Sequence, residues 1–390
     1  MVDLAGVPAP VNTPAAVAFT HDGELIWLAL QLAPIALAAV LLFTGAGARL
    51  RSRLERLCRG RRYGVITLFG FAWLIATWLL SLPLRALDHG RWATWGVPVA
   101  WSAWLTGQAV QLAVLLMGAA LLLWAPFALI RRAPRLWPVL ATLIVTPVLA
   151  AGLVAMQVLI QPMLTSYSPL QDAALKASIQ SMAERCGAGD VPVFVGGDDD
   201  TVVGLGQASR ILISPDSLHD ESRAQLLTTL AHELKHYRMG DNWLAIAVVG
   251  ALILGGAFLV QVFGGLAIRI FRRRFGFDSL ADPAAPPLMM LILTASWVLA
   301  GLPIFNAVQR HVELEADRFA LEVTHDNRAL AEYQAAVGKQ PWRMNVFDEP
   351  FRIWFANHPS QNERVQLADH YAPWKQGRPG RYDRICRPPA

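Results

Sequence analysis

The chain has 390 residues, of which 54% are hydrophobic and only 16% are charged. Soluble domains carry about 25% charged residues, so this composition, together with long apolar runs, excludes a soluble protein and indicates an integral membrane protein. The net charge of +5 does not indicate a nucleic-acid surface, because the arginines cluster beside apolar runs, where they report membrane topology.

Six apolar runs are long enough to cross a bilayer, at ~20 residues per crossing. They follow residues 1–24, which contain no Lys or Arg and so lack the basic start of a signal peptide, and no cleavage is expected. Pro83 is expected to bend or end the second run. The Trp-rich residues 89–106 are predicted to lie at the interface, but a crossing there would invert every later segment. The six runs cover residues 25–46, 64–84, 107–130, 137–159, 243–268 and 286–308.

These runs predict the domain organisation. Polar segments lie between and after them, and the last two runs form a hairpin between two polar segments. The predicted parts are an N-terminal segment (1–24), four membrane spans (25–161), a first polar segment (162–241), a membrane hairpin (242–309) and a second polar segment (310–390).

The first polar segment is predicted to mix helices and strands. Asp220 is expected to cap its second helix, and Gly240 to end it. The acidic run at residues 198–200 follows two glycines and is interpreted as a solvated turn rather than a calcium site. The strands are inferred from β-branched residues flanked by Gly and Pro. The predicted elements are helices over 170–185 and 222–239 and strands over 191–195 and 210–214.

The second of these helices carries the sequence His232-Glu233-Leu234-Lys235-His236. Residues four apart share a helix face, so both imidazoles can bind one Zn²⁺. Glu233 can then take a proton from a water held by the metal. The same spacing also occurs by chance, and a catalytic zinc site needs three protein ligands plus water. A third ligand therefore has to be found.

Glu313 and Asp317 follow the sixth apolar run and are also four residues apart. Glu313 can be the third ligand, and Asp317 can accept a hydrogen bond from a ligand imidazole and fix its tautomer. The alternative is a solvated helix face with ion pairs, which is the usual fate of such charges. We predict one Zn²⁺ per chain, bound by His232, His236 and Glu313.

Four pieces of the chain resemble, in order, the membrane zinc metallopeptidases typified by the type 1 CAAX prenyl protease and its bacterial heat-shock relatives. The resemblance covers residues 173–369, although Lys235 stands where relatives often have a small residue. The four pieces are Gly204-Leu205-Gly206 with the strand that follows, His-Glu-Leu-Lys-His, Arg310-x-x-Glu313-x-x-Ala316-Asp317, and His358-Pro359 with Arg364.

The resemblance implies a fold and a mechanism. The fold is mainly α: a polytopic membrane helical bundle with a small α+β zinc-peptidase domain at the membrane face. The implied activity is a zinc metalloendopeptidase with Glu233 as general base. His358 and Arg364 are assigned to substrate-backbone and transition-state contacts, and residues 201–214 are predicted to offer an edge strand to an extended peptide.

Three other interpretations remain open. Residues 230–243 also resemble the peptidase domain of β-lactam sensor-transducers, but the printed sequence leaves no room for their large sensor domain, and the His358 segment favours the first family. A catalytically silent membrane scaffold would lose a ligand or the base, and all of them are present. A transporter would place paired charges inside its spans, whereas these spans are nearly charge-free.

The arginine clusters predict an orientation. Residues 49–62, 131–135 and 269–274 share one face if there are six spans, and that face is predicted to be cytoplasmic. The zinc site is then expected on the periplasmic side of a bacterial inner membrane, although the best-known relatives work on the cytosolic side. The expected partners are the lipid bilayer and a membrane-associated protein or peptide substrate, without nucleic acid. Cys186 and Cys386 can form a disulfide if they lie close together in an oxidising compartment.

Overall fold

The computed structural model describes residues 4, 6–97, 100–155, 167–197 and 199–387. The predicted end of the fourth span at residue 159, the domain boundary at residue 161 and Asp198 lie outside these residues. The chain forms two compact units, one of residues 18–145 and 250–302 and one of residues 1–17, 146–249 and 303–390. We call the first the membrane unit and the second the site unit, and each is described by itself.

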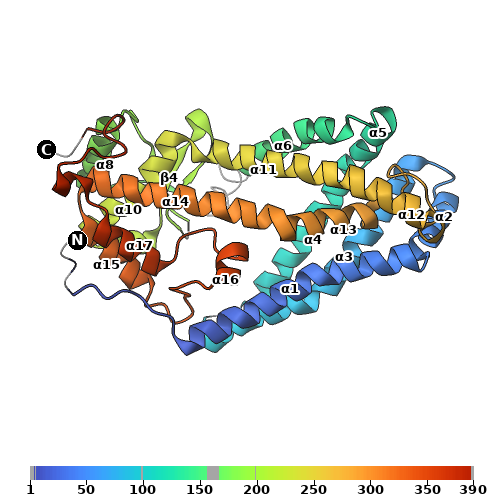
Figure 1. Ribbon diagram of the computed structural model, residues 1–390, viewed down its shortest axis with the longest axis horizontal. Coiled ribbons are helices and arrows are strands. Elements are labelled where there is room, and N and C mark those ends of the chain that lie inside the picture. The colour runs from blue at the N-terminus through green and yellow to red at the C-terminus, as the bar shows by residue number, and fades with distance from the viewer. Residues whose placement is uncertain (1–3, 5, 98–99, 156–166, 198, 388–390) are drawn as a thin grey trace. The chain divides into compact units, whose positions relative to one another are not determined.

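Within the described residues, six helical stretches are long and apolar enough to cross a membrane, as predicted from the sequence (Figure 1). Two of them contain a π-helical turn, at Val260–Gly264 and Trp297–Gly301. A short amphipathic helix, α2 (Ala46–Leu57), joins the first two stretches. The helices that build the six are α1 (Pro14–Phe43), α3 (Arg62–Arg91), α4 (Trp101–Leu122) with α5 (Trp124–Arg132), α6 (Trp137–Ala155), α11 (Asp241–Leu259) with α12 (Gly265–Phe275), and α13 (Pro286–Ser296) with α14 (Leu302–Thr324).

One local prediction changes in the structure, and another is retained. Helix α3 does not end at Pro83 but continues to Arg91, because neighbouring groups in a membrane bundle can satisfy the backbone that proline disrupts. The Trp-rich residues 89–106 contain no spanning helix of their own in the described part. They are divided between the end of α3, a 3₁₀ turn at Trp92–Trp95 and the start of α4.

The membrane unit has its own apolar core, which includes Phe69 of α3, Ile268 of α12 and Leu288 of α13. One partly buried ion pair supports it: Arg51 of α2 donates from Nη1 to Asp282 Oδ2 at 2.6 Å. Arg51 therefore holds the loop between α12 and α13, while other arginines of α2 are exposed.

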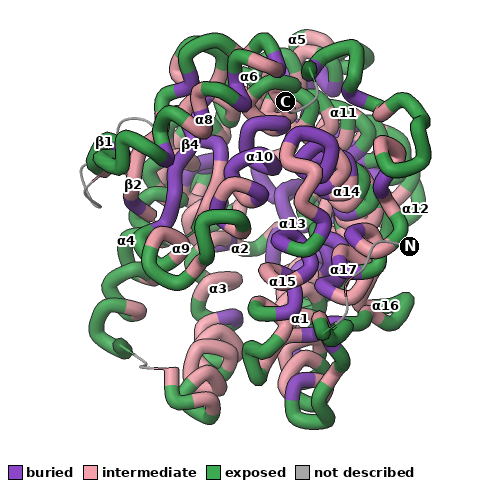
Figure 2. Tube along the Cα trace, turned by 90° about the vertical axis from the view of Figure 1, so that its left-hand side faces the viewer, coloured by how far each residue is buried: buried purple, intermediate pink, exposed green. Residues whose placement is uncertain are grey.

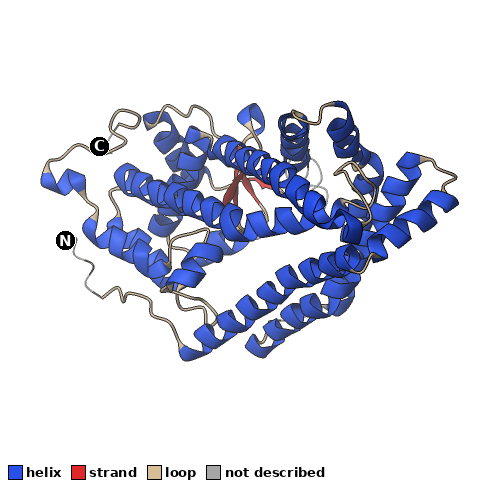
Figure 3. Cartoon of the chain, turned by 45° about the vertical axis from the view of Figure 1, so that its right-hand side comes forward, coloured by secondary structure: helices blue, strands red, loops and turns tan. Residues whose placement is uncertain are grey.

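The site unit contains a four-stranded sheet in the order β1-β2-β4-β3, and Figure 3 shows its strands in red among the helices. The predicted strands are present but shorter, and the short β1 and β3 are additional. β2 and β4 are parallel, whereas β3 pairs antiparallel with β4 through Val202 opposite Ile211. β3 is therefore an edge strand. The strands are β1 (Ser168–Pro169), β2 (Val193–Val195), β3 (Thr201–Val203) and β4 (Arg210–Ile213).

Helix α10 (Arg223–Met239) lies where the motif helix was predicted. Its N-cap is Ser222, which forms a capping box with Gln225, and not Asp220, which ends the preceding helix α9 (Pro215–Asp220). Gly240 ends α10 at φ 65°, a conformation that suits glycine. The other helices of the unit are α8 (Ala173–Arg185), α15 (Asn327–Val337), α16 (Glu349–Trp354) and α17 (Gln361–His370).

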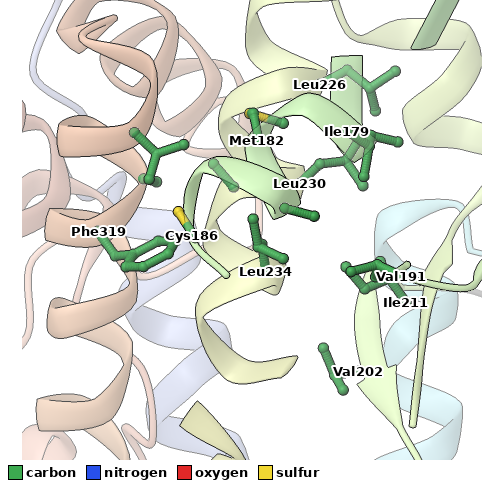
Figure 4. Close-up of a cluster of buried hydrophobic side chains, with 14 of the residues drawn as sticks. Ile179, Met182, Cys186, Val191, Val202, Ile211, Leu226, Leu230, Leu234 and Phe319 are labelled. Carbon is green, nitrogen blue, oxygen red and sulfur yellow. The ribbon is translucent and has the colours of Figure 1, made fainter. Parts of the chain in front are cut away.

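A hydrophobic cluster fixes α10 within the site unit (Figure 4). Leu230 and Leu234 of α10 are fully buried, as are Ile179 of α8, Ile211 of β4 and Phe319 of α14. Figure 2 colours the buried residues purple, and those of α10 lie in its middle, between Leu226 and Lys235. Cores of this kind are close-packed, so α10 and α14 are held in a defined register. A disulfide between Cys186 and Cys386 closes the edge of the cluster, as the sequence allowed.

Candidate active site

Helix α10 presents a core face and a polar face. Leu230 and Leu234 lie in the hydrophobic cluster. Because successive residues of an α-helix are separated by about 100°, His232 and His236 point away from these leucines by about 200°. The apolar pattern of the helix therefore turns both motif histidines toward α14, where Glu313 lies one helical turn before the fully buried Asp317.

Three ligand atoms converge as predicted. The Nε2 atoms of His232 and His236 are 3.1 Å apart, and Glu313 Oε2 and Oε1 lie 3.2 Å and 3.6 Å from them. Tetrahedral zinc with bonds of about 2.0–2.1 Å separates its ligand atoms by about 3.3 Å. The donor set and its spacing therefore fit one zinc ion.

The outer nitrogen of each imidazole contacts a carboxylate. His232 Nδ1 lies 3.0 Å from Asp317 Oδ1, and His236 Nδ1 lies 2.6 Å from Asp241 Oδ2. A carboxylate only accepts, so each Nδ1 carries the proton and each Nε2 lone pair faces the ligand position. The role of Asp317 was anticipated from the sequence, but that of Asp241 was not. The available signal was Gly240, whose left-handed turn brings the next residue back beside His236.

A buried cation stands behind each carboxylate. Arg364 of α17 donates from Nε to Asp317 Oδ2 at 2.7 Å and from Nη2 to Oδ1. Lys235 donates from Nζ to Asp241 Oδ2 at 2.7 Å and to the Val312 carbonyl at 3.1 Å. Buried charges are tolerated when they are paired and hydrogen-bonded. Lys235, which departs from the family pattern, therefore matches Asp241 in charge.

Glu233 and His358 complete the set of predicted catalytic groups. Glu233 is buried, and burial raises the pKa of its carboxyl group. His358 is half exposed at its side chain, with Nε2 3.4 Å from Glu313 Oε2. The structure therefore brings together all of the predicted site residues: the three ligands, Glu233, Asp317, His358 and Arg364.

Arg310 of α14 holds the segment that leads to His358. Its Nη1 donates to the carbonyl oxygens of Arg352 and Ala356. The sequence identified Arg310 as part of the third-ligand segment, and the structure shows that it anchors two carbonyl groups. The helix α17 that follows begins with a capping box at Ser360. The anchored carbonyl of Ala356 and the capped start of α17 at Ser360 therefore hold the chain on either side of His358.

A cavity of about 420 Å³ joins these groups to the edge strand. Glu233 and His358 line it, together with Thr201 and Val202 of β3 and Tyr333 of α15. A cavity of this size can enclose several side chains of a ligand. The catalytic groups and the edge strand therefore open onto the same space.

An acidic pair lies beside the β3 wall of the cavity. Ser217 Oγ donates to Asp200 Oδ2 at 2.6 Å, and Thr229 Oγ1 donates to Glu221 Oε2 at 3.2 Å. Burial, reinforced by the charge of Asp200, raises the pKa of Glu221 to about 7. Asp200 belongs to the acidic run that was predicted to be a solvated turn, and the structure corrects this for Asp200, whose carboxylate accepts hydrogen bonds from Ser214 N and Ser217 Oγ.

Comparison with known proteins agrees with this geometry. The family model for Peptidase family M48 matches residues 169–372. The uncharacterized metalloprotease YhfN of Bacillus subtilis is 25% identical over 352 residues, which cover 85% of this chain and 79% of that protein. CAAX prenyl protease 1 of Saccharomyces cerevisiae is 26% identical over 271 residues, which cover 62% of this chain and 57% of that protein. The chain thus spans less than two thirds of the yeast protein.

A solved structure gives the fold. The crystal structure of S. mikatae Ste24p superposes with a TM-score of 0.70, covering 94% of this chain and 93% of that chain at 18% sequence identity. At this identity the likeness is evidence of fold alone. It confirms the predicted mainly helical membrane fold with a small mixed sheet, and the other comparisons confirm the resemblance to membrane metallopeptidases.

Proposed function

This chain belongs to peptidase family M48, and from that premise we propose that it is a zinc metalloendopeptidase acting on membrane-associated proteins or peptides. The observation that carries the proposal is the convergence of His232, His236 and Glu313 beside a buried Glu233. One zinc ion per chain would be held by these three ligands, and when bound it supplies a Lewis acid and lowers the pKa of water.

The residues of the chain perform the proton transfers and the positioning. Glu233 takes a proton from the attacking water and returns it to the leaving amine. Asp317 and Asp241 keep the two ligand imidazoles in the tautomer that presents Nε2. Arg364 acts by holding Asp317, and His358 donates to the substrate.

Endopeptidase activity is supported by the edge strand. Thr201 and Val202 of β3 line the cavity that holds Glu233, and β3 is paired on one side only within the described sheet. An extended peptide can add to such an edge through main-chain hydrogen bonds. Binding of this kind needs no free chain end and tolerates varied side chains.

Membrane-associated substrates are inferred from the chain path. Gly240 separates α10 from the apolar helix α11, and Glu313 lies within the apolar stretch Pro286–Thr324. His236 and Glu313 are therefore within a few helical turns, at ~1.5 Å per residue, of segments that cross the bilayer. Substrates held at the membrane are the ones that reach the cavity most readily.

The periplasmic placement of the site is also a proposal. It is supported by the three arginine clusters and by the Cys186–Cys386 disulfide, since disulfides persist in oxidising compartments. Alkaline-phosphatase fusions at Gln171 and at the C-terminus are expected to be active. Inactive phosphatase fusions, with fluorescent protein fusions at the same positions, would instead place the site in the cytoplasm.

The experiment that tests the function compares the wild type with Glu233→Gln. The amide is nearly isosteric but cannot take a proton, so the variant is expected to keep about one zinc per chain and lose peptidase activity. Glu332→Gln, on an exposed face of α15, is the matched control and retains activity. Proteomics of membranes containing wild type or Glu233→Gln identifies the substrates. Normal turnover by Glu233→Gln would sink the mechanism, whereas absence of peptidase activity in the wild type itself would indicate a catalytically silent scaffold.

A further inference from the structure

Helix α15 contributes one face to the cavity wall. Leu330, Tyr333 and Gln334 all line the cavity that contains Glu233 and His358. Residues at i, i+3 and i+4 share a helix face, so the placement follows from the helix itself. Neither Tyr333 nor Gln334 belongs to a sequence motif that was singled out.

Gln334 and Asp317 together accept hydrogen bonds from the guanidinium group of Arg364. Asp317 accepts from Nε and Nη2. In the amide orientation that satisfies both groups, the Gln334 oxygen lies 3.2 Å from Arg364 Nη1. Every nitrogen of Arg364 therefore has an acceptor inside the protein. This arrangement suits Arg364 to positioning Asp317 and leaves the stabilisation of a substrate oxyanion to other donors.

The hydroxyl group of Tyr333 is a hydrogen-bond donor on a residue that lines this cavity. Among the described residues, its hydroxyl has no hydrogen-bond partner, although the residue is half-buried in the cavity wall. Burial, together with the charges of Glu221, Asp200 and Glu233, raises the pKa of Tyr333 to about 12. The phenol is therefore within electrostatic reach of the general base and keeps its proton at neutral pH.

We propose that the Tyr333 hydroxyl is a catalytic donor that hydrogen-bonds the carbonyl oxygen of the scissile peptide as that oxygen becomes an oxyanion. The inference rests on the proposed peptidase function. In the step, the water oxygen bonds to the carbonyl carbon, Glu233 takes the water proton, and the π electrons move onto the carbonyl oxygen. A lone pair of the oxyanion then re-forms the carbonyl double bond as the C–N bond breaks, the C–N electron pair goes to nitrogen, and Glu233 protonates that nitrogen. Tyr333 keeps its proton throughout.

The test is Tyr333→Phe, which keeps the ring and removes the donor. The probe is a quenched fluorogenic peptide that the wild type cleaves and Glu233→Gln does not. A donor used mainly in the transition state affects kcat, so we expect kcat to fall on the order of 10²-fold, with KM within about twofold. Zinc content is unchanged, and affinity for a phosphinic transition-state mimic falls by the same factor as kcat. Tyr371→Phe, whose hydroxyl donates to Glu322 outside the cavity, is the matched control and keeps kcat.

The outcomes separate this proposal from the proposed function. Unchanged kcat in Tyr333→Phe, or a rise in KM alone, overturns the role of Tyr333 and leaves the peptidase intact. Absence of Glu233-dependent cleavage by the wild type, across a fluorogenic peptide library, overturns both. If Tyr333→Phe unfolds or loses zinc, 3,5-difluorotyrosine at position 333 decides the matter. Its phenol ionises at lower pH, so the alkaline limb of kcat/KM moves to lower pH, and an unmoved limb refutes the donor role.

Discussion

Replacing Asp317 with Asn tests the support behind the metal ligands. The fully buried carboxylate contacts His232 Nδ1 and accepts two hydrogen bonds from Arg364, whose side chain is only 12% exposed. The Asn side chain is nearly the same size but neutral, so it leaves the Arg364 charge buried without its counterion. It also weakens the acceptor that fixes the His232 tautomer.

The expected cost follows from these two losses. Removing one partner of a buried ion pair costs about 3–5 kcal/mol, which lowers the unfolding midpoint of a unit of this size by roughly 6–20 °C. Losing the carboxylate behind a ligand histidine weakens metal binding ~10–100-fold. The double variant Asp317→Asn/Arg364→Gln removes the stranded charge and is expected to recover part of the stability without recovering zinc affinity.

The assay pairs thermal unfolding in detergent with zinc retained during dialysis against a graded chelator. Asp369→Asn, on the partly exposed end of α17, is the control and should match the wild type in both. The reasoning is refuted if Asp317→Asn unfolds at the wild-type temperature and holds zinc with wild-type affinity. It is also refuted in part if the double variant is less stable than Asp317→Asn, since Arg364 would then not be the source of the cost.

Three further predictions follow from other contacts. The raised pKa of Glu221, about 7, means that the folded state holds this proton more tightly than the unfolded state, so its stabilising contribution is present below pH ~4.5 and lost as the pH rises through 7. Glu221→Gln should therefore gain stability over the wild type at pH 8 more than at pH 5, measured by thermal unfolding at both values. Arg310→Lys should lower kcat with zinc retained, because the loop leading to His358 loses an anchor; equal kcat would contradict this. Cys386→Ser should cost about 2–4 kcal/mol by removing the bond to Cys186, seen as a lower unfolding midpoint that reductant reproduces in the wild type and no longer changes in the variant.

The sequence predicted the parts of the site that local periodicity encodes. His232 and His236, and likewise Glu313 and Asp317, are four apart, and a helix places such residues on one face whatever surrounds it. The six apolar runs were equally accessible, because bilayer thickness fixes the length of a spanning helix. The ends of the elements were less accurate. Asp220 and Ser222 are both good caps, and only the tertiary fold selects Ser222.

What the sequence could not supply was the meeting of residues from different elements. Asp241 reaches His236 through the turn at Gly240, and the buried Lys235 donates to the same carboxylate oxygen. Tyr333 lies on a helix with no motif, and its relevance depends on which face packs toward α10. Such contacts are set by close packing of the whole unit, and periodicity within one element carries no information about them.

The order of the site residues along the chain has a consequence for biosynthesis. Asp317 follows its partner His232 by 85 residues, and Arg364 follows His232 by 132. The apolar hairpin lies between the motif and Glu313. At a synthesis rate of ~5–20 residues per second, roughly 4–17 s separate the first histidine from its carboxylate. During that interval the hairpin is synthesised, and Glu313 can reach the histidines only after it has followed. A nascent or truncated chain therefore carries the His-Glu-x-x-His helix without a complete site, and the hydrolytic centre is complete only after the second polar segment has been made.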